Sequence, residues 1–149
     1  MILNRGSETF DSPRKVKTWD KLRQLIEELG TMELKPAVQE EMVRSVQELN
    51  VFQGSDAKLI SLARKKMNGI LRVLEKEMNV VPKNEYRLRW LALGMSVFGV
   101  PMGVVFGLIL ENMAFLGIGL PIGLTLGIAI GNSMDQRAAQ EGRQLKFER

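Results

Sequence analysis

The chain of 149 residues contains no cysteine and no histidine. Without cysteine there is no disulfide bond, no thiolate nucleophile and no thiolate ligand for a metal. Without histidine the usual acid–base side chain near neutral pH is missing. Serines such as Ser45 and Ser61 therefore have no imidazole base, and no glycine-rich phosphate loop precedes a lysine and a threonine in the required order. We expect a protein that is not an enzyme and that uses no metal or cofactor.

A strong excess of either charge sign is also lacking. The chain has 21 lysines and arginines against 17 aspartates and glutamates, a net charge of +4. Both signs are mixed through the amino-terminal part, so the sequence shows no cluster of basic residues that would indicate a nucleic-acid-binding surface. Nucleic-acid binding is not expected.

Charge is almost absent from Trp90 to Ile130, where Glu111 is the sole ionisable residue. At about 1.5 Å per residue, a helix over residues 90–110 is about 30 Å long, the hydrocarbon thickness of a bilayer. A second apolar run covers residues 115–131. The sequence predicts a transmembrane hairpin over residues 85–133, because so short a chain has too little other protein to bury two such helices.

Residues 1–84 are predicted to form amphipathic helices, in contrast to the wholly apolar helices of the hairpin. Apolar residues recur at steps of three and four over residues 16–29, 36–50 and 56–79, with Trp19 and Leu22 beginning the first stripe. A small helical bundle would bury these stripes against one another. Alternatively, they meet neighbouring subunits or lie on a membrane surface, with the basic cluster Arg64-Lys65-Lys66 facing anionic headgroups.

Basic residues flank both apolar runs, whereas the connecting turn has none. Lys83, Arg87 and Arg89 precede the first run, and Arg137 and Arg143 follow the second. Positive charge stays on the cytoplasmic side of a membrane, so both termini are expected in the cytoplasm, with residues 134–149 as a charged tail. The fold class predicted is all-α: cytoplasmic amphipathic helices, then a two-helix transmembrane hairpin.

Glycines recur at every fourth position of both apolar runs. They are Gly99, Gly103 and Gly107 in the first run and Gly119, Gly123, Gly127 and Gly131 in the second. Four residues turn a helix by 400°, so each set forms a groove without side chains, where a second helix can approach closely in lipid. We predict that these glycines form the helix-packing interface, within one chain or between chains.

The two runs also resemble each other at a separation of twenty residues. GVPMGVVFGLIL aligns with GLPIGLTLGIAI, which matches three glycines and pairs Pro101 with Pro121. The match indicates an internal repeat. Each proline removes one helical hydrogen bond and is expected to kink its helix.

The stretch GLPIGLTLGIAIGNSMDQRAAQEGRQL resembles the glycine-zipper segments of small bacterial two-helix membrane proteins, and the likeness covers residues 94–145. The resemblance implies close helix packing, often between identical chains, and a place in the bacterial inner (cytoplasmic) membrane. It implies no particular activity.

Two functions follow as expectations. In the first, the protein is a homo-oligomeric membrane scaffold whose partners are lipid, further copies of itself and a cytoplasmic protein that binds its helical module. In the second, the oligomer is an ion channel or pore gated by the cytoplasmic helices, with Glu111 as an acidic group at its mouth. Ser96 and Thr125 are expected to bond to carbonyls of their own helices rather than to form a solute site.

Overall fold

The computed structural model of the protein describes residues 3–149, and these fall into two compact units. The first unit comprises the described residues up to Pro82, together with Leu145–Phe147 and Arg149. The second comprises Lys83–Gln144 and Glu148. The fold is mostly helical, with 77% of residues in helices.

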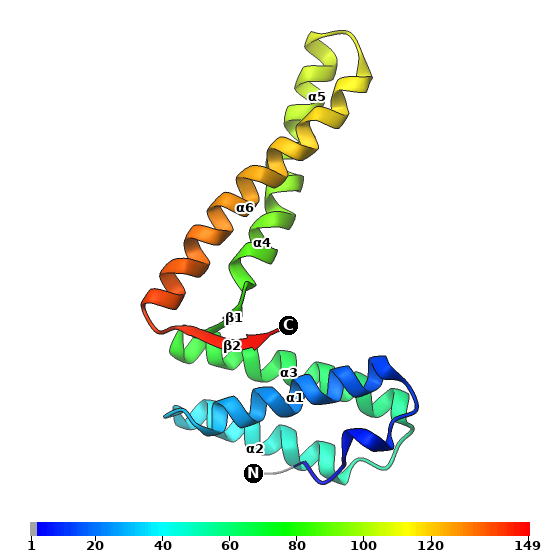
Figure 1. The fold of residues 1–149 in the computed structure, drawn as a ribbon, viewed down its shortest axis with the longest axis vertical. Coiled ribbons are helices and arrows are strands. Elements are labelled where there is room, and N and C mark those ends of the chain that lie inside the picture. Colours follow the sequence, from blue (N-terminus) through cyan, green and yellow to red (C-terminus); the bar gives the residue numbers. More distant parts are fainter. Residues whose placement is uncertain (1–2) are drawn as a thin grey trace. The chain divides into compact units, whose positions relative to one another are not determined.

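The first unit contains three long helices and most of a small sheet (Figure 1). Its elements are a 3₁₀ turn at Ser7–Thr9, α1 (Pro13–Gly30), α2 (Pro36–Val51) and α3 (Asp56–Met78), and the paired strands are β1 (Val81–Lys83) and β2 (Gln144–Glu148). Proline opens α1 and α2, where its missing N–H costs no helical bond. Asn79 ends α3 in the left-handed conformation, with φ of 55°.

The apolar stripes of the three helices share one core, which confirms the intramolecular bundle. The buried residues include Trp19, Leu22, Ile26 and Leu29 of α1, Val38, Met42, Val46 and Leu49 of α2, and Ile60, Ala63, Met67, Ile70 and Leu74 of α3. Each fully buried large side chain stabilises the unit by about 1.5–3 kcal/mol relative to exposure. The stripes are therefore buried against one another within the first unit.

Residues 134–149, predicted as a charged tail, contain the end of a helix and a strand, so a small two-stranded sheet adds to the predicted helices. Helix α6 continues to Gln140, and β2 then pairs with β1. In β2, Leu145 and Phe147 alternate with charged residues and join the core of the first unit. Two apolar side chains at a spacing of two suit a strand with one buried face, and the charges around them concealed this pattern.

The second unit is a helical hairpin. Its first arm runs through α4 (Glu85–Leu93), a π-helical segment (Gly94–Gly99) and α5 (Val100–Ile109). Its second arm runs through a 3₁₀ turn (Met113–Phe115) and α6 (Leu116–Gln140). The arms are 25 and 28 residues long, and both are long and apolar enough to cross a membrane. The expectation of two such helices is therefore confirmed.

Candidate functional site

The glycines of the two arms face each other across the hairpin. A Cβ atom built on Gly119 would lie 2.6 Å from the Cα of Gly103, and one built on Gly123 would lie 2.6 Å from the Cα of Gly99. Real Cβ atoms essentially never come so close to backbone. Only glycine permits this separation of the two helices.

The close approach continues along the arms in both directions. Towards the charged end, a Cβ on Gly131 would lie 2.5 Å from the Cα of Arg87, and one on Gly127 would overlap the carbonyl of Trp90. Towards the turn, Gly103 lies against Leu116, and Gly107 lies against Met113. A Cβ atom built on any of these glycines would thus lie within 4 Å of the opposite arm of the same chain.

Gly94 belongs to this face, although the four-residue spacing does not include it. A Cβ on Gly94 would lie 2.8 Å from the Cα of Gly127. Gly94 precedes Gly99 by five residues, which would place it off the face of a regular α-helix. The π-helical segment between them takes up the extra residue: the N–H of Val100 donates to the carbonyl of Met95, five residues back. The broken spacing was the sequence signal for this bulge.

The two prolines lie in different surroundings. Pro101 is at the start of α5, directly after the π-helical segment, where the altered hydrogen bonding removes the need for its N–H. Pro121 lies inside α6, which remains one continuous helix from Leu116 to Gln140. The hydroxyl of Thr125 donates to the carbonyl of Pro121 at 2.8 Å.

The hydroxyl of Ser96 in the first arm bonds in the same way. Ser96 donates to the carbonyl of Ala92 at 2.9 Å, so both hydroxyls are satisfied on their own helices as predicted.

Glu111 lies in the turn between the arms and adopts a left-handed conformation, with φ of 50°. Its side chain is exposed, and Asn112 beside it accepts a hydrogen bond from the N–H of Ala114 at 2.9 Å. Glu111 and Asn112 therefore mark the end of the hairpin that is opposite to its basic flanks. The role of Glu111 at a pore mouth stays a prediction.

Asp135 is a site residue that the sequence reasoning missed. Its buried carboxylate accepts hydrogen bonds from the backbone N–H groups of Tyr86 at 3.2 Å and Arg87 at 2.9 Å. These N–H groups are in the first turn of α4, where no helical carbonyl reaches them, and Asn84 provides no side-chain cap. Asp135 follows Gly131 by four residues and so continues the glycine face, which was the available signal.

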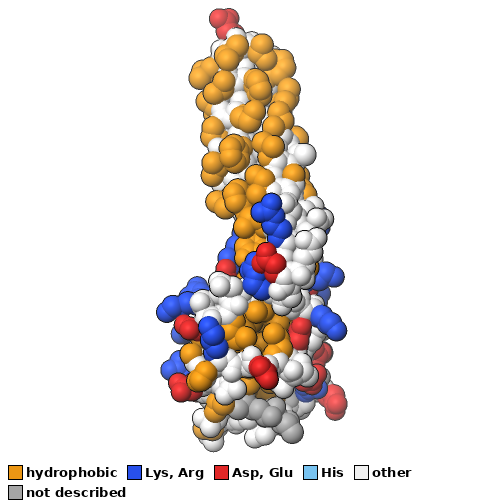
Figure 2. Space-filling view, turned by 90° about the vertical axis from the view of Figure 1, so that its left-hand side faces the viewer, with side chains coloured by type: hydrophobic (Ala, Val, Ile, Leu, Met, Phe, Trp, Pro, Cys, Tyr) orange, Lys and Arg blue, Asp and Glu red, His pale blue; other side chains and the backbone are white. Residues whose placement is uncertain are grey.

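The candidate functional site is therefore a tightly paired helical hairpin with an outer apolar surface. Hydrophobic side chains gather over much of the face of this unit that Figure 2 shows, and only 22% and 17% of the most apolar windows of the two arms are buried. Within residues 3–149, no three acidic side chains gather as a metal site would require.

These features define a mostly helical protein with two helices that could span a membrane. Comparison of the chain with protein-family models, with curated proteins and with solved structures finds no match.

Proposed function

We propose that the protein is an integral membrane protein whose hairpin anchors a helical interaction module to the bilayer. The arms span the membrane and pack through a glycine zipper within one chain. The first unit is then displayed on the cytoplasmic side, where it binds a protein partner. The protein acts in this proposal as a scaffold and catalyses no reaction.

The observation that carries the proposal is the outward direction of the apolar side chains. The small residues of the hairpin lie inside, and large ones lie outside: Val97, Val104, Val105, Leu108, Leu120 and Leu126 are all exposed. In a water-soluble helix pair the large apolar residues would be buried between the helices, because burial stabilises each by about 1.5–3 kcal/mol. A surface of this kind is suited to lipid tails.

The glycine contacts support the same environment. Glycine in a water-exposed helix costs about 1 kcal/mol relative to alanine. In lipid, water cannot compete for the helical hydrogen bonds, and close backbone approach supplies dispersion and weak Cα–H···O contacts. The repeated glycines therefore favour a hairpin that is packed inside a bilayer.

The orientation proposed follows from the two ends of the hairpin. Because the arms are antiparallel, Arg87 and Arg137 belong to the same end of this unit, and Glu111 belongs to the other (Figure 1). The positive end is placed in the cytoplasm, and the membrane is taken to be the bacterial inner membrane that the glycine-zipper resemblance implies.

Self-association is proposed to use the outward apolar faces of the arms. The glycine grooves are already filled by the opposite arm, since an added methyl group at Gly119 or Gly123 would overlap that arm. A homo-oligomer would then form side by side, with both glycine faces retained inside each chain. The pore hypothesis rests on the sequence alone.

Single cysteines test the membrane topology, because the native chain contains none. Variants Asn4→Cys, Asn112→Cys and Gln140→Cys are exposed to an impermeant thiol reagent in intact cells and again after lysis. We expect labelling of Asn112→Cys in intact cells and of the other two only after lysis. Extraction of the unmodified protein by alkaline carbonate would contradict membrane insertion.

A further inference from the structure

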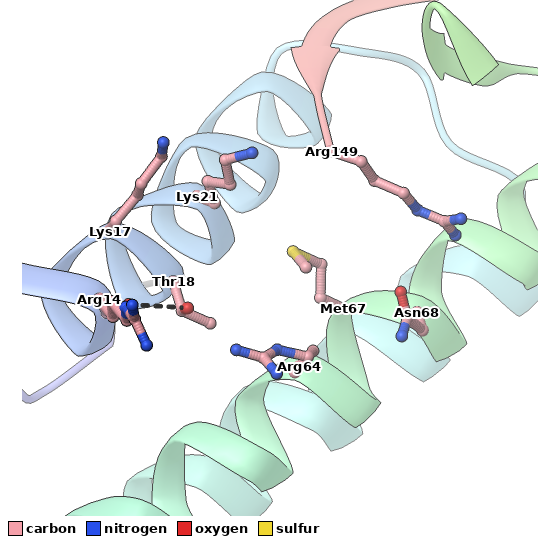
Figure 3. Close-up of a pocket in the computed structure, with 8 residues that line it drawn as sticks. All are labelled: Arg14, Lys17, Thr18, Lys21, Arg64, Met67, Asn68 and Arg149. Atoms are coloured by element: carbon pink, nitrogen blue, oxygen red, sulfur yellow. Dashed lines mark hydrogen bonds between the residues drawn. The ribbon is translucent and has the colours of Figure 1, made fainter. Parts of the chain in front are cut away.

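A cavity of about 430 Å³ in the first unit lies between α1 and α3 and is lined mainly by cations (Figure 3). Its lining residues are Arg14, Lys17, Thr18 and Lys21 of α1, Arg64, Met67 and Asn68 of α3, and Arg149 after β2. No acidic side chain is among them. The volume falls within the range of about 300–1,000 Å³ that is usual for small-molecule pockets.

Four of the cations that line this pocket make no ion pair with the described part of the protein. Within residues 3–149, Arg14, Lys17, Lys21 and Arg64 make no ion pair. Other basic residues nearby do pair, since Lys15 contacts Asp11 at 3.3 Å and Lys66 contacts Glu48 at 2.5 Å. The four cations Arg14, Lys17, Lys21 and Arg64 therefore keep their charge at a pocket that has no acidic side chain in its lining.

The cations that α1 contributes to this pocket repel one another. Arg14, Lys17 and Lys21 follow at steps of three and four, which places like charges on one helical face. Arg14 also lies in the first turn of α1, which has no acidic residue, although the positive end of the helix dipole favours anions there. A bound anion would offset both the mutual repulsion and the unfavourable dipole interaction.

We propose that this pocket binds a phosphate-bearing ligand. Guanidinium groups pair with phosphate through two parallel hydrogen bonds, and Arg64 points across the groove towards Arg14 and Thr18 in Figure 3. Lysines 17 and 21 add charge at the rim, and the amide of Asn68 provides a neutral donor. Met67 gives the pocket an apolar floor, which suits the organic part of a phosphorylated molecule.

The phosphate could belong to a soluble molecule or to a lipid headgroup, and two probes distinguish them. The full chain in a non-ionic detergent is titrated with inorganic pyrophosphate, and separately with short-chain phosphatidic acid, by isothermal titration calorimetry. Sulfate at equal ionic strength serves as the reference anion. Saturable binding of pyrophosphate indicates a soluble ligand, whereas binding of phosphatidic acid alone indicates a headgroup.

The variant Arg14→Gln/Arg64→Gln is expected to weaken binding of the effective probe at least tenfold. The matched control is Lys58→Gln/Lys65→Gln, which removes the same charge from exposed positions of α3 outside the pocket and should change the affinity less than threefold. Circular dichroism verifies that both variants keep the helical content of the parent. Equal weakening by both pairs, or binding of neither probe above the sulfate reference, would overturn the proposal.

Discussion

Asp135 Oδ2 accepts a hydrogen bond of 2.9 Å from the backbone N–H of Arg87, which joins the end of one arm of the hairpin to the beginning of the other. Its second oxygen accepts from the N–H of Tyr86, so one side chain of α6 caps the first turn of α4. A carboxylate at this position also interacts favourably with the positive end of the helix dipole.

Replacing Asp135 should destabilise the end of the hairpin where α4 begins. Asp135→Ala leaves two backbone N–H groups without partners, and we expect a loss of about 1–2 kcal/mol in the free energy of unfolding, the usual cost of a lost cap. The measurement is denaturant unfolding of the detergent-solubilised protein by circular dichroism. Gln136→Ala, at an exposed neighbouring position, should be neutral. Equal stability of the two variants would show that the cap contributes nothing.

The glycine face can be tested with an internal control in the same helix. A Cβ at Gly123 would meet backbone of the opposite arm, whereas a Cβ at Gly117 would meet nothing within 4 Å. Gly123→Ala should therefore cost about 1–3 kcal/mol by overpacking, and Gly117→Ala should stay within about 0.5 kcal/mol of the parent. Unfolding in detergent measures both. A tolerated Gly123→Ala would mean that the arms do not pack through this face.

Because of the π-helical segment, we expect two single-residue deletions in the first arm to differ in their effect on stability. Removing Phe98 converts the five-residue step from Gly94 to Gly99 into a regular step of four, so the glycine face survives and the hairpin should still form. Removing Val105 shortens the step from Gly103 to Gly107 to three and rotates α5 by about 100° against the rest of its arm. The second deletion should destabilise the hairpin more. Protease protection of the protein reconstituted into lipid vesicles compares them, and the reverse order would be incompatible with the bulge.

Glu28 should hold β2 in place. Its carboxylate accepts hydrogen bonds from the backbone N–H groups of Lys146 at 2.6 Å and Phe147 at 2.9 Å. We expect Glu28→Ala to destabilise the first unit by about 1–3 kcal/mol, as for charge-assisted bonds, and to speed amide exchange in residues 144–148. Glu27→Ala, on the exposed side of α1, is the control. Unchanged exchange in Glu28→Ala would exclude this role.

The Glu48–Lys66 pair predicts a pH dependence. The hydrogen bond from Lys66 lowers the pKa of Glu48 below its ordinary value of 4.5. The folded state therefore binds this proton less readily than the unfolded state, so the pair stabilises the protein above about pH 4.5, and this stability is lost as the pH falls through the lowered pKa.

Melting temperatures from pH 3 to pH 7 should show the parent above Glu48→Gln near neutrality, with the difference shrinking in acid. The difference should be small, because Glu48 is exposed and solvent screens the pair. Salt should reduce it further. A difference in melting temperature between parent and variant that grows as the pH falls would contradict the predicted direction of the pH dependence.

Much of the helical architecture could be predicted from local sequence patterns. The stripe that begins at Trp19 and Leu22 indicated the bundle, because a helix repeats every 3.6 residues and one apolar face must be buried. The charge-free runs indicated two long apolar helices for a similar reason, since length and composition are properties of the chain itself. Hydroxyl bonding at Ser96 and Thr125 is also local, because the acceptor lies one turn back on the same helix.

The tertiary structure decided the contacts between segments that are distant in sequence. Only pairing of the arms shows that Gly119 faces Gly103 within one chain, and that Asp135 caps a helix that begins fifty residues earlier. Only the fold of the first unit shows that Phe147 of the expected tail enters a core and that Glu28 binds its strand. A periodic pattern determines which face of a helix is apolar or small, but the partner of that face depends on the free energy of packing the whole chain.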